Sequence, residues 1–173
     1  MAKRLILIFP LITIACWFWG RAGNLVCQRV FVCKTALALI VGLAISGFIG
    51  VIFPLERPFV LGIGQHFLAH APTPSFPSNH ATIAFIFAFG FLFWLRNWIG
   101  LLLFIPAFTI AWARIFLGVH WPLDMVGAFL VAIMACGISQ TIWELGGHKL
   151  LPYIIKAYQI LFAPLIKKGW IRG

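Results

Sequence analysis

Five long apolar runs occupy most of this 173-residue chain and restrict it to one kind of fold. They lie at residues 5–19, 35–53, 81–95, 98–113 and 121–143. About 20 apolar residues are needed for a helix to cross the hydrocarbon core of a bilayer, where only helices and closed barrels satisfy their backbone groups. We therefore predict an all-α, polytopic bundle of five membrane-spanning helices, formed by a single domain over residues 1–173.

The composition supports a membrane location, since 63% of the residues are hydrophobic and only 9% are charged. A chain of this length has no room for a separate soluble catalytic domain beside five spans. Any chemistry must therefore take place at the ends of the helices.

The chain carries a formal charge of +10, from 13 Lys and Arg against three acidic residues. On a soluble protein this excess would suggest nucleic acid, but basic residues also collect in the cytoplasmic loops of membrane proteins. Here nine of the 13 lie between runs one and two, between runs three and four, or after run five, and alternate threading puts these segments on one side. We expect that side to be the cytoplasm and expect no nucleic-acid partner. Segments 54–80 and 114–120 then face the outside.

The tail at residues 146–173 mixes apolar and basic residues. This pattern predicts an amphipathic helix on the cytoplasmic headgroups of the membrane. A sixth span is the alternative, although Pro152 and Pro164 would interrupt it.

The most specific polar cluster on the outer side contains His120 and Asp124, which are four residues apart at the start of the fifth run. On a helix they share one face. The carboxylate can accept the proton of one imidazole nitrogen, which leaves the other nitrogen able to attack or to accept a proton. The alternative is a pair that only caps and anchors the helix.

Ser78, Asn79 and His80 directly precede the third run, where Ser78 or Asn79 can cap a helix. The N-terminus of such a helix presents unpaired N–H groups, which bind phosphate. An ordinary helix cap is the alternative interpretation.

Arg57 and Arg114 also fall on the outer side, and each guanidinium suits the oxygens of a tetrahedral anion. Together with a helix N-terminus they predict a phosphate site. The alternatives are an ion pair between Arg57 and Glu56 and a headgroup contact of Arg114.

A metal site is a second interpretation of the histidines, because His66 and His70 are four residues apart and His80, His120 and Asp124 could join them. The sequence has no H-E-x-x-H motif, and Glu144 lies near the opposite end of the fifth run. We therefore expect no metal and no cofactor.

Taken together, Arg57-Pro58, Pro77-Ser78-Asn79-His80 and Arg114 with His120 and Asp124 resemble the three-part signature of the type 2 phosphatidic acid phosphatase superfamily. Within that superfamily, the sequence at 76–80, 117–124 and 168–172 is similar to bacterial undecaprenyl-diphosphate phosphatases. Three positions depart from the usual pattern, in which lysine, glycine and serine stand at the places of Gly50, Asn79 and Ala113. These departures bear on substrate preference more than on reaction type.

The resemblance implies that His120 attacks phosphorus and forms a phosphohistidine, while Asp124 holds its ring. His80 would protonate the leaving group and then activate water. The phosphate oxygens would be held by Arg57, Arg114, Ser78 and the backbone near Asn79.

The expected reaction is hydrolysis of undecaprenyl diphosphate to undecaprenyl phosphate and phosphate at the outer face of a bacterial plasma membrane, which recycles the lipid carrier of cell-wall sugars. Membrane lipids are the expected surroundings. The alternatives are a phosphatase or phosphotransferase for phosphatidylglycerol phosphate, phosphatidic acid or another lipid phosphate, a metal-dependent hydrolase, and a non-enzymatic transporter.

Overall fold

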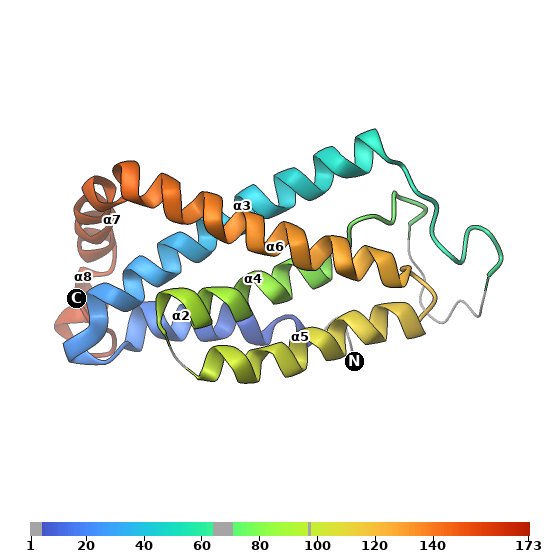
Figure 1. Cartoon of the computed structure of the whole chain (residues 1–173). Coiled ribbons are helices and arrows are strands. Elements are labelled where there is room, and N and C mark those ends of the chain that lie inside the picture. The colour runs from blue at the N-terminus through green and yellow to red at the C-terminus, as the bar shows by residue number, and fades with distance from the viewer. Residues whose placement is uncertain (1–4, 64–70, 97) are drawn as a thin grey trace.

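The computed structural model describes residues 5–63, 71–96 and 98–173, and every regular element in this part of the chain is helical. The elements are α2 (Ile8–Trp19), the 3-10 turn η1 (Ala22–Asn24), α3 (Leu25–Ile52), α4 (Asn79–Trp94), α5 (Ile99–Phe116), α6 (Pro122–Ile142), the π-helical turn η2 (Trp143–Gly147), α7 (His148–Leu161) and α8 (Ala163–Lys167). The helices from α2 to α6 run along one bundle, whereas α7 and α8 lie across one of its ends (Figure 1). The predicted all-α bundle is confirmed.

Each of the five apolar runs corresponds to one of the long helices. Three helical stretches, Leu25–Ile52, Ile99–Phe116 and Pro122–Leu161, are long and apolar enough to cross a membrane. The other two, α2 with 12 residues and α4 with 16, are apolar but shorter. α3 begins ten residues before the predicted run because it includes Arg29 and Lys34, whose side chains find polar partners at this end of the bundle.

The core of the bundle forms around α4, which packs against α3, α5 and α6. Ten of the 16 residues of α4 are buried, and its hydrophobic residues continue around the whole helix, as expected for a central helix. The Phe85 ring contacts Phe108 and Phe129 at centroid distances of 5.2 Å each. These edge-on ring contacts join α4 to α5 and α6.

Two glycines allow other parts of the chain to lie very close to α5 and α6. A Cβ on Gly100 would lie 2.5 Å from the Leu92 nitrogen, so only glycine allows the tight α4–α5 hairpin that the short 96–98 segment predicts. A Cβ on Gly127 would lie 2.4 Å from the Phe76 ring. Phe76 therefore rests directly on α6 and places the segment that leads into α4.

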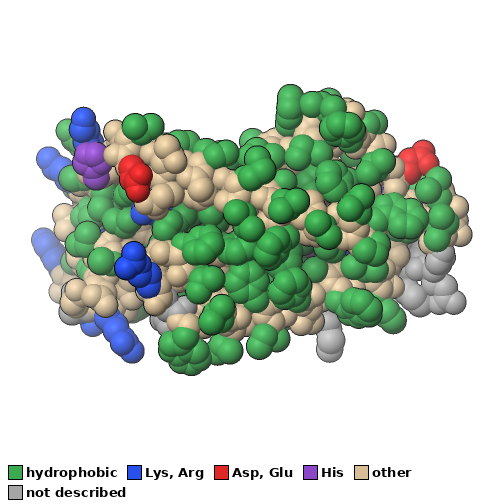
Figure 2. Space-filling model, in the orientation of Figure 1, with side chains coloured by type: hydrophobic (Ala, Val, Ile, Leu, Met, Phe, Trp, Pro, Cys, Tyr) green, Lys and Arg blue, Asp and Glu red, His purple; other side chains and the backbone are tan. Residues whose placement is uncertain are grey.

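The tail turns at η2, so α7 crosses the end of the bundle instead of running along it (Figure 1). α7 buries Leu151 and Tyr158 and exposes Lys149 and Lys156, which is the predicted amphipathic pattern. The structure gives no sixth helix along the bundle within the described residues. Most of the visible basic side chains lie at this end, as Figure 2 shows. That this end faces the cytoplasm stays a prediction.

Candidate active site

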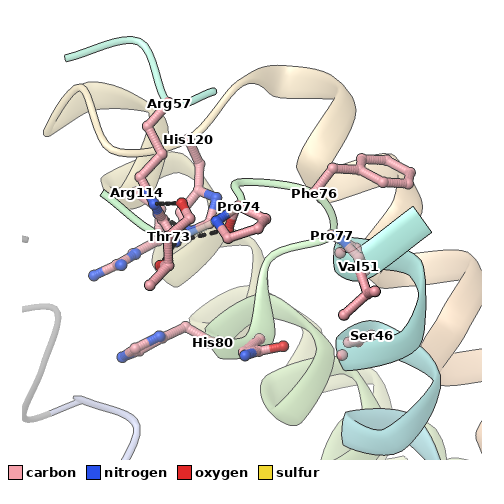
Figure 3. A pocket seen from close by; sticks show the side chains of 13 residues that line it. Ser46, Val51, Arg57, Thr73, Pro74, Phe76, Pro77, His80, Arg114 and His120 are labelled. Atoms are coloured by element: carbon pink, nitrogen blue, oxygen red, sulfur yellow. Dashed lines mark hydrogen bonds between the residues drawn. The ribbon is translucent and has the colours of Figure 1, made fainter. Parts of the chain in front are cut away.

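A cavity of 390 Å³ lies at the opposite end of the bundle, among the helix ends and the loops that join them. Figure 3 shows its polar side chains, which come from the loop after α3, the first turn of α4, the last turn of α5 and the loop before α6. Five of the seven predicted site residues line it: Arg57, Asn79, His80, Arg114 and His120. Ser78 and Asp124 are buried directly beside these residues.

Arg57 holds together three loop segments with its guanidinium. Its Nε donates to the Thr73 carbonyl at 2.8 Å, and its Nη2 donates to the Thr73 hydroxyl at 3.2 Å and the Pro74 carbonyl at 3.1 Å. Its Nη1 donates to the Val119 carbonyl at 2.9 Å and lies 3.1 Å from His120 Nε2. These contacts use all five N–H groups of the side chain. The alternative of an Arg57–Glu56 ion pair is therefore wrong.

His120 and Asp124 form the predicted pair across the start of α6. Their Nδ1 and Oδ2 atoms are 2.9 Å apart, and Asp124 Oδ2 also accepts the Trp121 backbone N–H at 2.9 Å. Because the carboxylate accepts, Nδ1 carries the proton and Nε2 keeps its lone pair. Nε2 accepts from Arg57 Nη1 and lines the cavity. Asp124 thus both caps α6 and orients the His120 imidazole.

The electrostatics keep His120 neutral. Burial lowers the pKa of His120, the hydrogen bond to Asp124 opposes this shift, and the positive charges of Arg57 and Arg114 add to it. Burial also lowers the pKa of Arg57, against the attraction of Asp124. A neutral imidazole, which carries a lone pair on Nε2, is the form that can act as a nucleophile or a base.

Arg114 differs from Arg57 in having no hydrogen-bond partner within the described part of the chain. Its side chain is completely buried near the end of α5, and none of its three nitrogens has a hydrogen-bond partner among the described residues. A buried guanidinium without acceptors is costly. It lines the same cavity as His120, so an anion in that cavity would supply the missing acceptors.

The segment that precedes α4 also lines the cavity. Ser78 is the N-cap residue of α4, but its side chain makes no capping bond, while its backbone N–H donates to the Asp124 carbonyl at 3.2 Å. This bond ties the start of α4 to the start of α6. Asn79 and His80 in the first turn line the cavity, beside the backbone N–H groups with which the helix begins.

Several residues at the site have no signal in the sequence. Thr73 and Pro74 bind Arg57 mainly through backbone carbonyls, which any residue type could provide. Ser46, Gly47, Gly50 and Val51 of α3 form another wall of the cavity. Gly50, where the family pattern has lysine, is part of this wall, so a side chain at this position would border the cavity.

The metal interpretation receives no support from the described part of the chain, where no three His, Cys, Asp or Glu side chains converge. His66 and His70, on which it depends, lie outside the described residues.

Fold and site together define a helical membrane protein with a buried, cationic, histidine-containing pocket at one end of its bundle. Residues 31–145 match the profile of the PAP2 superfamily, and the chain belongs to this superfamily. The family expected from the three motifs is thereby confirmed.

The comparisons with known proteins are more specific. The chain is 48% identical over 172 residues to the Escherichia coli (strain K12) protein named "Putative undecaprenyl-diphosphatase YbjG", covering 99% of this chain and 85% of that protein. It is 30% identical over 166 residues to undecaprenyl-diphosphatase BcrC of Bacillus subtilis (strain 168), covering 94% and 81%. The crystal structure of Aquifex aeolicus LpxE matches with a TM-score of 0.58 and 25% identity, covering 79% of this chain and 86% of that one.

Proposed function

We propose that this protein hydrolyses undecaprenyl diphosphate to undecaprenyl phosphate and inorganic phosphate, without a metal, through a phosphohistidine on His120. The observation that carries the proposal is the completely buried guanidinium of Arg114, which has no hydrogen-bond partner among the residues that the structure describes and lies in the same cavity as the oriented His120 imidazole. This combination suits an anionic phosphorus centre. The names of the two relatives that match most of the chain support the choice of lipid.

In the first step, His120 Nε2 attacks the terminal phosphorus in line, and the bond from phosphorus to the bridging oxygen breaks. Asp124 stabilises the imidazole ring as positive charge develops on it. Arg57 Nη1 now donates to His120 Nε2, so it must pass this N–H to a phosphate oxygen before the attack. Arg114, Ser78 and the backbone at Asn79 hold the remaining oxygens.

His80 gives its proton to the departing lipid phosphate, because it is the second histidine that lines the cavity. In the second step it takes a proton from water, which attacks the phosphohistidine and releases phosphate. The net reaction consumes one water and leaves the enzyme unchanged.

We further propose that the site faces the outside of a bacterial plasma membrane and the tail faces the cytoplasm. The basic residues of the described chain, apart from the two site arginines, lie toward the α7 end (Figure 2). The positive-inside rule favours the cytoplasm for this end.

The decisive experiment measures phosphate release from undecaprenyl diphosphate by detergent-purified protein in excess EDTA. We expect release in wild type, none in His120→Ala, and an unchanged rate in His148→Ala, whose exposed histidine lies at the opposite end. Loss of release in EDTA would favour a metal-dependent hydrolase. Faster turnover of phosphatidylglycerol phosphate or phosphatidic acid would assign another lipid phosphate, and transfer of the phosphate to a lipid acceptor would indicate a phosphotransferase. No release from any lipid phosphate would favour a transporter.

A further inference from the structure

A second polar cavity, of 510 Å³, lies near the α7 end of the bundle, away from the candidate active site. It is formed by α3, by α6, and by the end of α4 with the turn that follows it. The proposed reaction makes no use of it. Its lining combines two cations, Lys34 and Arg96, with the aromatic rings of Trp94 and Phe93.

The two cations reach the cavity from separate elements. Lys34 Nζ donates to Gln140 Oε1 at 2.8 Å and lies 5.8 Å from the centre of the Trp94 ring, which holds the ammonium in place. An ammonium has two further N–H groups for a ligand. Arg96 follows α4 with a φ of 47°, in the left-handed region that non-glycine residues seldom adopt.

The acidic residues of the chain neutralise this cavity only in part. The sequence contains three acids, and two of them, Glu56 and Asp124, lie at the opposite end. The third, Glu144, is exposed, binds the Gln140 amide and attracts Lys34 electrostatically, although it is not part of the lining. Its single charge offsets only one of the two cations, Lys34 and Arg96. The cavity therefore has a net positive charge and favours an anion.

The other part of the lining is apolar and faces outward from the bundle. Phe93 and Ile133 expose 48% and 40% of their surface on α4 and α6. Gly137 lies between Ile133 and Gln140 in the sequence of α6, and a Cβ added to it would meet nothing within 4 Å. The cavity thus offers a charged part and an adjoining apolar groove, which matches a lipid better than free phosphate.

We propose that this cavity binds the anionic headgroup of a phospholipid in the leaflet at the α7 end, with an acyl chain along Phe93 and Ile133. Basic pockets between membrane helices at headgroup depth commonly bind acidic lipids in this way. The site is separate from the proposed phosphatase pocket and does not depend on its activity.

Native mass spectrometry of the detergent-purified protein with added phosphatidylglycerol tests the proposal by counting bound lipids. The variant Lys34→Gln/Arg96→Asn keeps a side chain that can bind Gln140 and a residue type tolerant of the left-handed backbone. At about 1 kcal/mol for each basic residue, it should weaken retention of one lipid about 30-fold. Gly137→Leu should block the same lipid without changing the charge.

Matched controls locate the lipid. Lys149→Gln/Lys156→Gln removes the same charge from exposed positions at the same end and should retain the lipid, as should Arg57→Gln, altered at the other pocket. Phosphatidylcholine of equal chain length should not be retained.

Unchanged retention in both cavity variants, or equal loss in the Lys149/Lys156 control, would overturn the proposal. Displacement of the lipid by millimolar inorganic phosphate would overturn the choice of a lipid as ligand. Thermal melts of each variant separate lost binding from lost folding.

Discussion

Replacing Arg114 by methionine should make the ligand-free protein more stable and the enzyme much less active. Arg114 is completely buried and has no protein acceptor among the described residues, so its charge is uncompensated. An unbranched apolar side chain of similar length removes this penalty, which we take as about 2 kcal/mol. For a chain of this size, that corresponds to a rise in Tm of about 4 to 8 °C.

The same substitution should lower kcat/KM for phosphate release by about 100- to 1000-fold, the usual loss when one oxyanion donor is removed. Inorganic phosphate at about 100 times its Kd should stabilise wild type by about 2.7 kcal/mol and leave Arg114→Met unaffected. Differential scanning fluorimetry in detergent, with and without phosphate, measures both quantities.

Arg57→Met is the matched control, because the Arg57 guanidinium makes five hydrogen bonds, whereas that of Arg114 makes none with the described residues. Losing these bonds should destabilise the protein by about 3 kcal/mol. The two arginines should therefore respond with opposite signs. If Arg114→Met melts below wild type, or phosphate still stabilises it, the assignment of Arg114 as the unpaired phosphate contact is refuted.

Three further outcomes follow from the same geometry. Asp124→Asn should lower kcat about 100-fold or more, because the amide can turn its NH2 group, a donor, toward His120 Nδ1. Phosphate release measures this loss, and an unchanged rate would contradict the orienting role of Asp124. Because burial lowers the pKa of His120, which must be neutral to attack, kcat/KM should persist below the ordinary histidine range and fall as pH drops through the lowered pKa. Arg114→Met removes a positive charge and should move this acid limb to higher pH; an unmoved limb would count against His120 as the titrating group. Gly127→Ala should displace the Phe76 ring and reduce activity about tenfold or more, with Phe76→Leu restoring part of it in the double variant; a fully active Gly127→Ala would show that this contact does not position the site.

The parts of the fold that the sequence predicts are those that depend on periodicity and length. Apolar runs identify all five long helices because the bilayer requires continuous apolar surface. The start of α3 is missed because charged residues such as Arg29 and Lys34 are typical of loops. In the structure both belong to α3, where Arg29 donates to the Arg172 carbonyl and Lys34 donates to the Gln140 side-chain oxygen. Local polarity alone cannot show that such partners exist.

The same division holds at the site. The His120–Asp124 bond is predicted because both residues lie within one helical turn, and spacing alone brings them together. The clamp made by Arg57 is not predictable, since its acceptors include the carbonyls of Thr73 and Val119, which are defined by the path of the loops. For the same reason the sequence does not distinguish the paired Arg57 from the unpaired Arg114.

The loop between Arg57 and Thr73 is fastened at its base, by the Arg57 side chain and by the Ser75 N–H bond to the Leu55 carbonyl at 2.8 Å. Doubling the length of a loop closed in this way adds only about 0.6 kcal/mol of closure entropy. The exposed stretch at Leu61–Ile63 is therefore a suitable place for an inserted epitope. An antibody applied to intact cells would then report directly on which side of the membrane the pocket opens, with the geometry of the pocket left in place.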